Sequence, residues 1–200
     1  MREVIPMVSI RPASPADSAA ILAIYAPYVN ETAISFEEPA PTLAEFTARV
    51  AGICAEYPYL VAETDGQIVG YAYAHRHKER AAYGWNAELS VYLAPSAQGN
   101  GLGKALYGAL MAILARQNVR NVYGCVTMPN EKSVALHHSL GFTDAGVWHA
   151  SGFKHGKWRD VAWFEKTIAP LSVPPEPFVP VTALDPAAVE AICARFSPQK

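Results

Sequence analysis

Alternating apolar and polar side chains, together with β-branched and aromatic residues, mark the strands of this chain. The clearest pair of strands is joined by Asp65-Gly66, a dipeptide typical of a two-residue hairpin turn. Pro95 ends another such run, because proline cannot continue the hydrogen bonding of a strand. On this pattern we predict strands over residues 8–11, 59–64, 67–75, 83–93, 121–127, 143–150 and 159–168, with a tight loop at His155-Gly156 between the last two.

Apolar residues at helical spacing lie between these strands and come with start and stop signals. Ser14, Pro15 and Asp17 are typical of a helix start, and Thr42 with Glu45 predicts a capping box. We predict helices from residue 14 on, from 42 to about 56, from 102 to about 118, and from 130 to 140, the last ending at the C-cap glycine Gly141.

The resulting order, β-α-α-β-β-β-α-β-α-β-β, predicts an α/β fold in which helices cover both faces of a mixed sheet. After Ile168 the composition changes, since seven prolines lie among residues 170–200. We expect this tail to be an extended strap over the surface, with room for a short helix over 185–195. The predicted organisation is therefore one domain over residues 7–169 and a Pro-rich C-terminal extension over 170–200.

The bulk properties limit what this chain can be. It has 200 residues, enough for one domain and an appendage, and its net charge of −2 with scattered Lys and Arg argues against a nucleic-acid partner. It has no apolar run long enough for a membrane span, and its opening segment 1–6 lacks the apolar core of a signal peptide. We expect a cytoplasmic protein with no membrane partner, and we expect Cys54, Cys125 and Cys193 to be core residues in a reducing compartment.

The segment between the 83–93 strand and the 102–118 helix carries the strongest chemical signal. It reads Gln98-Gly99-Asn100-Gly101-Leu102-Gly103-Lys104. Three glycines in five positions let a ligand approach the backbone closely, while the helix start offers unpaired N–H groups and a positive dipole end. Together with the charge of Lys104, these features predict a cradle for a pyrophosphate.

Two common phosphate-binding fingerprints do not fit this loop. Ala105 stands where Walker A needs Ser or Thr, and Lys104 stands where the Rossmann spacing needs glycine. The Gln-x-x-Gly-x-Gly spacing instead resembles the acyl-CoA loop of the GNAT superfamily of N-acetyltransferases. The order of elements is also the GNAT order, so the resemblance covers about residues 8–168. It implies a mixed, mostly antiparallel central sheet and acetyl-CoA as the co-substrate.

Two further segments resemble the phosphinothricin acetyltransferase branch of that superfamily. They are residues 82–88, Ala-Tyr-Gly-Trp-Asn-Ala-Glu, and residues 152–160, Gly-Phe-Lys-His-Gly-Lys-Trp-Arg-Asp. The resemblance implies a homodimer and a small amino-acid-like acceptor such as phosphinothricin, methionine sulfoximine or methionine sulfone. It also implies that pantetheine lies along the 83–93 strand, pyrophosphate on the glycine loop, and an asparagine beside the coenzyme. The coenzyme-binding residues expected on this basis are Val91, Tyr92, Leu93, Gln98, Gly99, Asn100, Gly101, Leu102, Gly103, Lys104, Asn130 and Ser133.

Glu88 is our candidate for the general base, because acetyl transfer to an amine needs a group that takes the proton of the amine. It lies three residues before Val91, on a strand whose alternate positions, Ala87, Leu89, Val91 and Leu93, are apolar. The alternative is a glutamate on a solvated strand face. The family resemblance favours the catalytic role, exerted directly or through a water molecule.

His137 is the second catalytic candidate. In many GNAT enzymes a tyrosine seven residues after the coenzyme-binding asparagine protonates the leaving thiolate, and here the residue seven after Asn130 is His137, as in the phosphinothricin branch. A neutral imidazole could orient the amine or accept its proton, and an imidazolium could protonate the sulfur. The alternative is a helix histidine that is hydrogen-bonded in the core.

Candidates for acceptor binding lie near the reacting end of the predicted sheet. Lys78 or Arg80 could pair with a carboxylate or phosphinate, although a charged loop can also be simply solvated. Tyr83 is on the same loop. Phe36 follows the first helix, where the resemblance implies a substrate-side loop, but it could equally anchor the core.

Other chemistries are less favoured by the residues. His75 and His77 share a strand face, as metal ligands sometimes do, but the sequence offers no third ligand and we expect no metal. Cys125 has no activating group close in sequence, so we expect direct attack by the amine in a ternary complex. Two other functions stay open, a protein or peptide N-acetyltransferase and a non-catalytic acyl-CoA-binding regulator.

Overall fold

Seven strands form one sheet within residues 8–198, the part of the chain that the computed structural model describes. The predicted domain start at residue 7 and the opening segment 1–6 lie outside the described residues. In the sheet order the strands are β1 Val8–Pro12, β2 Tyr59–Thr64, β3 Gln67–Arg76, β4 Asn86–Leu93, β5 Asn121–Thr127, β7 Lys157–Thr167 and β6 Thr143–Lys154. Neighbouring strands run antiparallel except β4 and β5, which are parallel. The expected mixed, mostly antiparallel α/β sheet is confirmed.

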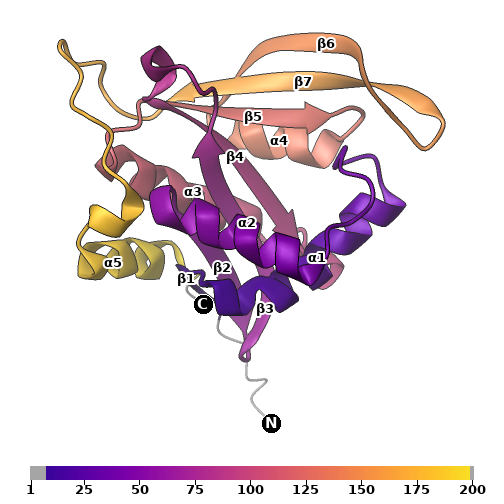
Figure 1. Ribbon diagram of the computed structural model, residues 1–200, viewed down its shortest axis with the longest axis horizontal. Helices are drawn as coiled ribbons and strands as arrows, with labels where there is room; N and C mark the ends of the chain where they lie inside the picture. The colour runs from indigo at the N-terminus through magenta and orange to yellow at the C-terminus, as the bar shows by residue number, and fades with distance from the viewer. Residues whose placement is uncertain (1–7, 199–200) are drawn as a thin grey trace.

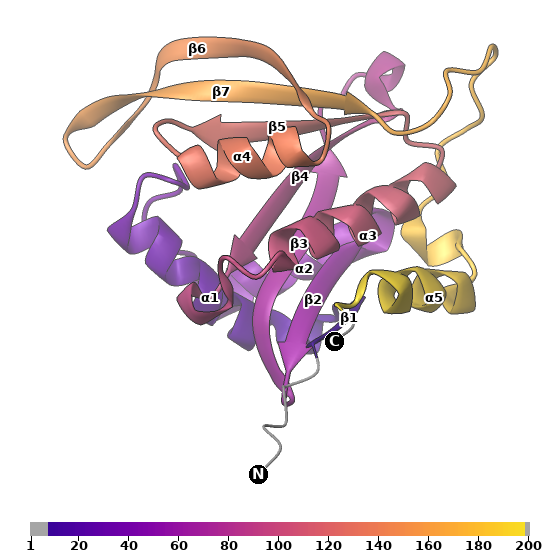
Figure 2. The ribbon, with the colours of Figure 1, turned by 180° about the vertical axis from the view of Figure 1, so that it is seen from behind.

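Helices cover both faces of this sheet, as Figures 1 and 2 show from opposite sides. Helices α1 (Ser18–Glu31) and α2 (Leu43–Glu56) pack on one face of β2 and β3, where Tyr59, Val61 and Tyr71 are buried. On the other face α3 (Leu102–Arg116) forms a second core with α4 (Glu131–Ser139) and α5 (Pro186–Phe196). Short 3₁₀ turns lie at Pro15–Asp17, Ala81–Tyr83, Pro95–Ala97 and Val181–Ala183.

Local signals in the sequence account for most of the element boundaries. The predicted capping box forms, since the Glu45 N–H donates to Thr42 Oγ1 at 3.3 Å and the Thr42 N–H donates to Glu45 Oε2 at 2.8 Å. Gly141 ends α4 with a φ of +79°, the left-handed conformation that glycine tolerates. Asp65-Gly66 forms the turn between β2 and β3.

Two strand predictions are corrected by the pairing of neighbouring strands. β4 begins at Asn86 and not at residue 83, because β3 ends at Arg76, opposite Ala87, and residues 81–83 have no strand beside them and form a 3₁₀ turn. The last hairpin is longer than predicted. It extends past the predicted end at residue 150 as far as Lys154 because Gly152 pairs with Arg159, and this pairing outweighs a weak local strand tendency.

The Pro-rich tail adds to the core as well as crossing the surface. Its extended part is fixed by hydrogen bonds, among them Gln117 Nε2 to Val179 O at 2.8 Å and Trp85 Nε1 to Glu176 O at 2.7 Å. The helix for which the sequence left room is present as α5, and it packs against β1 and α3 with Val189 and Cys193 buried. The tail is therefore a strap followed by a docked helix.

Candidate active site

The central feature of the site is a gap between β4 and β5. The two strands pair only from Asn86 to Leu89, opposite Asn121 to Gly124, and then separate, so the strands on either side diverge in Figure 1. Ala94 donates its N–H to Val69 of β3, which turns the backbone groups of alternate residues, Val91 and Leu93, toward the gap. This unpaired edge is suited to a ligand that carries amide groups, which is what the family resemblance implies for pantetheine.

Two tyrosines mark the ends of this open edge. The Tyr107 hydroxyl, on α3, donates to the carbonyl of Leu89 at 3.2 Å, where the strands part. The Tyr28 hydroxyl, on α1, donates to the carbonyl of Leu93 at 2.6 Å. The polar groups of Val91 lie between them. Neither tyrosine was singled out from the sequence, because helical spacing identifies an apolar face and not the carbonyl that a phenol reaches.

The glycine-rich loop follows the end of β4 and leads into α3. Gly99 and Gly101 have φ values of +82° and +77°, and a Cβ at either position would meet no heavy atom within 4 Å. The loop therefore needs glycine for its backbone conformation, and its outer side is open. α3 begins at Leu102 with Gly101 as its N-cap, so the unpaired N–H groups of its first turn are those of the predicted cradle.

Side chains around the loop hold it against neighbouring elements. Gln98 donates to the Tyr28 hydroxyl at 3.1 Å and accepts from Lys132 at 3.2 Å. Asn130 caps α4 by accepting from the Ser133 N–H at 3.2 Å, which gives this predicted coenzyme contact a structural task as well. Lys104 lies exposed in the first turn of α3.

Glu88 lies on the α1–α2 side of β4, between two histidines. Its side chain is 19 % exposed, with Oε2 at 3.4 Å from His77 Nδ1 and Oε1 at 4.0 Å from His75 Nε2. His77 is itself fixed by stacking on Tyr123, with ring centroids 4.3 Å apart. Within residues 8–198 no group of three or more His, Cys, Asp or Glu side chains is placed to hold a metal ion. The arrangement is a partly buried carboxylate flanked by two imidazoles.

His137 lies on the face of the sheet opposite to Glu88, in the core, where its ring packs against Gly124. It is 2 % exposed, its ring stacks on Phe164 at 4.9 Å, and Nδ1–H donates to the Ser133 carbonyl at 2.8 Å. Nε2 is buried without a hydrogen-bond partner and lies only 2.2 Å from where a Cβ on Gly124 would be, so glycine is needed there. Burial lowers the pKa of His137, and near neutral pH the ring therefore presents a lone pair at Nε2.

Cys125 corrects one prediction. It was expected in the core, as Cys193 is, but it is exposed, because it lies on β5 just past the last residue that pairs with β4. Its thiol still loses hydration, which raises the pKa of Cys125 to about 12. A thiol with that pKa is almost entirely protonated near neutral pH and is a weak nucleophile.

The predicted acceptor-binding residues fall into two groups. Lys78, Arg80 and Tyr83 share the loop that leaves His77, and the Lys78 amine lies over the Tyr83 ring at 5.0 Å from its centroid. Phe36 lies on the loop between α1 and α2 and packs against the backbone of Gly152 in β6. The structure thus brings Lys78 and Tyr83 together and places Phe36 on a different element.

Comparison with known proteins identifies the family. The model of the "Acetyltransferase (GNAT) domain" matches residues 10–163. Phosphinothricin N-acetyltransferase of Streptomyces viridochromogenes is 38% identical over 177 residues, 88% of this chain and 96% of that protein. The L-methionine sulfoximine/L-methionine sulfone acetyltransferase of Salmonella typhimurium is 32% identical, over 84% of this chain and 98% of that protein.

Among solved structures, the phosphinothricin acetyltransferase of Sinorhizobium meliloti in complex with acetyl-CoA superposes with a TM-score of 0.78. It is 37% identical, and the match covers 80% of this chain and 88% of that one. An open sheet edge that runs into a glycine loop at a helix start is the architecture of an acyl-CoA-dependent acyltransferase. The chain belongs to the GNAT superfamily of acetyltransferases.

Proposed function

We propose that this protein transfers the acetyl group of acetyl-CoA to the α-amine of a small amino-acid-like acceptor of the phosphinothricin, methionine sulfoximine or methionine sulfone type. The observation that carries the proposal is the partly buried carboxylate of Glu88 beside the gap between β4 and β5. The relatives named for these acceptors, which match over most of the chain, support this acceptor class.

The residues present fit acetyl-CoA as the second substrate. Pantetheine would pair with the open edge at Val91, flanked by Tyr92 and Leu93, and Asn130 and Ser133 would lie on its α4 side. The pyrophosphate would bind the N–H groups between Gln98 and Lys104, where Asn100, Leu102 and Gly103 complete the loop with the two positive-φ glycines. Acetyl-CoA supplies an activated thioester when bound.

Glu88 would take the proton from the α-ammonium, directly or through a water molecule, and His75 and His77 would help pass it to solvent. His137 packs against Gly124, at the vertex of the gap, from the other face of the sheet, and its Nε2 is buried there. A neutral ring is suited to orienting the amine or accepting its proton and not to protonating the thiolate, and either role requires that ligand binding expose Nε2. The high pKa of Cys125 supports direct transfer in a ternary complex over an acyl-cysteine.

On the acceptor side, Lys78 or Arg80 would pair with the acidic group of the acceptor, and Tyr83 and Phe36 would line the pocket. The guanidinium of Arg80 makes no hydrogen bond or ion pair with any other described residue, so it is available for an acidic ligand. The catalytic domain over residues 7–169 would then act with the C-terminal extension 170–200, whose described part, residues 170–198, docks on the α3 side.

We further propose a cytoplasmic homodimer. Trp148, Phe153 and Trp158 are exposed on the β6–β7 hairpin, Trp158 by 66 %, which is unusual for large aromatic side chains and supports contact with a second copy. Among the described residues there is no helix with the length and apolar character needed to cross a membrane. Light scattering after size exclusion would test the dimer, with Trp158→Ser expected to shift it toward monomer.

The test of the proposed function is an assay of CoA release with acetyl-CoA and each acceptor, phosphinothricin, methionine sulfoximine and methionine sulfone. Product with at least one of them is expected. Release only with a peptide acceptor would establish a protein or peptide acetyltransferase. Tight acetyl-CoA binding without turnover would establish a regulator.

A further inference from the structure

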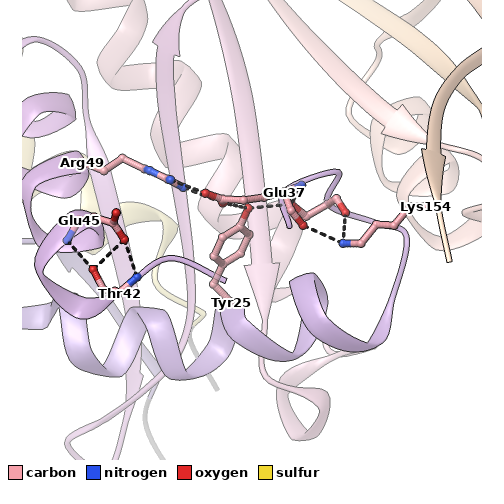
Figure 3. A network of polar contacts seen from close by, with 7 residues as sticks. Tyr25, Glu37, Thr42, Glu45, Arg49 and Lys154 are labelled. Carbon is pink, nitrogen blue, oxygen red and sulfur yellow. Dashed lines mark hydrogen bonds and ion pairs between the residues drawn. The ribbon is translucent and has the colours of Figure 1, made fainter. Parts of the chain in front are cut away.

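Lys154, at the end of β6, is a buried lysine that neither the coenzyme site nor the proposed chemistry uses. It is 2 % exposed, and its ammonium donates to the carbonyls of Val29, Ser35 and Glu37 at 2.6, 2.7 and 3.0 Å. A buried ammonium is costly unless its three donors are all satisfied, and here one carbonyl of α1 and two of the loop that follows it satisfy them. Figure 3 shows the Lys154 side chain reaching this segment beside Glu37.

The segment that Lys154 binds is the loop between α1 and α2, residues 32–42. Val29 lies in the last turn of α1, where carbonyls lack intrahelical partners and the helix dipole favours a cation. The next residue of the hairpin, His155, lies with Nε2 at 3.2 Å from the carbonyl of Thr32. Lys154 therefore holds the backbone on both sides of Phe36, and His155 holds the start of the loop at Thr32, each over a separation of more than 100 residues in sequence.

The opposite side of the same segment is fixed through side chains. Glu37 accepts from Arg49 at 2.9 Å and from the Tyr25 hydroxyl at 2.8 Å, and Tyr25 also contacts Ser35 Oγ at 2.7 Å. Figure 3 shows Arg49, Tyr25 and Lys154 converging on Glu37. Residues 35 and 37 are thus held on both flanks, which leaves little freedom for the residue between them.

That residue is Phe36, whose ring rests on Gly152. A Cβ at Gly152 would lie 2.3 Å from Phe36 Cε2, so any other residue there would displace the ring. Phe36 is 40 % exposed, so part of the ring packs on the hairpin and the rest faces solvent. The ring is therefore held in place while leaving a surface free for a ligand.

We propose that Lys154 and Gly152 are positioning residues that set the Phe36 ring against the acceptor and so determine acceptor affinity. The proposal rests on the acceptor pocket described under the proposed function. Lys154 fixes the backbone that carries Phe36, and Gly152 provides the surface on which its ring lies. Neither residue contacts the coenzyme loop, so both act on the acceptor side alone.

The experiment measures acceptor KM, kcat and acetyl-CoA Kd for Lys154→Met and Gly152→Ala. Loss of three charge-assisted hydrogen bonds, or displacement of the ring, is expected to raise acceptor KM about tenfold or more. The acetyl-CoA Kd and kcat at saturating acceptor should change by less than about threefold. The matched controls are Lys157→Met, an exposed lysine of the same hairpin, and Gly52→Ala, a helix glycine with no atom within 4 Å of the added Cβ. Both controls should keep the wild-type acceptor KM.

A double-mutant cycle of Gly152 and Phe36 is the most direct test. If Gly152 acts through the Phe36 ring, Gly152→Ala should have no further effect on acceptor KM in a Phe36→Ala background. A full additional increase in that background would overturn the inference. Should Lys154→Met fail to fold, as judged by its thermal transition, the Gly152→Ala cycle decides alone.

Failure of this inference and failure of the proposed pocket can be told apart. If Phe36→Ala raises acceptor KM while Lys154→Met and Gly152→Ala leave it unchanged, the pocket stands and the positioning role is wrong. If Phe36→Ala leaves acceptor KM unchanged, Phe36 does not line the pocket and the inference is overturned together with that part of the proposed function.

Discussion

The hydroxyl of Tyr28 donates to the carbonyl oxygen of Leu93 at 2.6 Å and accepts from Gln98 Nε2 at 3.1 Å. One side chain of α1 thus links the last residue of β4 to the first residue of the glycine loop. These are the two regions where the coenzyme is expected to lie, although Tyr28 belongs to neither. The position of the open edge relative to the loop therefore depends on this phenol.

Tyr28→Phe should weaken acetyl-CoA binding without changing the fold. It removes both hydrogen bonds of the phenol and keeps the ring, and a lost hydrogen bond of this kind is worth about 1 kcal/mol, or about fivefold in Kd. Calorimetry with acetyl-CoA measures the effect. Tyr57→Phe, at a tyrosine that packs on Phe178 of the tail, is the control, and equal Kd values for the two variants would contradict the role of Tyr28.

Gly101→Val should weaken acetyl-CoA binding more strongly. Gly101 has a φ of +77°, which a β-branched residue adopts only with strain, so the backbone of the predicted pyrophosphate cradle must move. We expect an increase of about tenfold or more in the acetyl-CoA Kd, on a strain of roughly 1–2 kcal/mol. Gly52→Val, in α2, should leave the Kd as it is. An unchanged affinity in a folded Gly101→Val protein would exclude this loop as the coenzyme site.

Glu88→Gln should lower kcat by about 10²–10⁴-fold at pH 7, because the amide keeps the shape of the side chain but cannot accept a proton. Acetyl-CoA affinity should be retained. Raising the pH should partly restore the variant, since solvent then supplies free amine. Near-normal kcat at pH 7 would show that Glu88 is not the base, and His137 would take its place.

Lys78→Ala and Arg80→Ala separate the two candidates for the acidic group of the acceptor. Substitution of the residue that pairs with the acceptor should raise the acceptor KM about tenfold or more. A hydrogen bond to a charged group is worth about 1.5–3 kcal/mol when binding desolvates that group. The acetyl-CoA Kd should not change. Steady-state kinetics with the acceptor varied measures this, and an unaltered acceptor KM in both variants would remove this loop from the pocket.

The buried imidazole of His137 should make the protein less stable in mild acid. Its pKa is lowered by burial, so below about pH 6.5 the unfolded chain takes up a proton that the folded chain excludes. This contribution to the free energy of unfolding is fully present above that pH and is lost as the pH falls toward the lowered value. Urea unfolding at pH 7.5 and 5.5 measures the loss, which should be smaller for His137→Asn. The same loss in both proteins would show that His137 does not titrate on unfolding.

Local sequence signals were enough to predict most of the elements and the glycine loop, whose binding of the coenzyme stays a prediction. The Thr42–Glu45 capping box, the turn at Asp65-Gly66 and the positive φ of Gly101 all depend on residues within a few positions of one another. Chain geometry over such short distances is set by side-chain type and backbone sterics, which can be read from the sequence directly. The family resemblance then predicted that acetyl-CoA binds the glycine loop and that Glu88 and His137 have catalytic roles.

Contacts between distant segments were decided only by the tertiary structure. The antiparallel register of β3 and β4 sets His75 opposite Glu88, and the separation of β4 from β5 exposes Cys125, which the sequence placed in the core. Lys154 meets Ser35 across 119 residues, and Tyr28 meets Leu93 across 65. The periodicity of apolar residues does not encode these long-range contacts, because they depend on how the strands align and on which helix covers which face of the sheet. The sequence by itself determined most of the elements and the glycine loop, and the packing of the sheet determined what surrounds Glu88, His137 and Phe36.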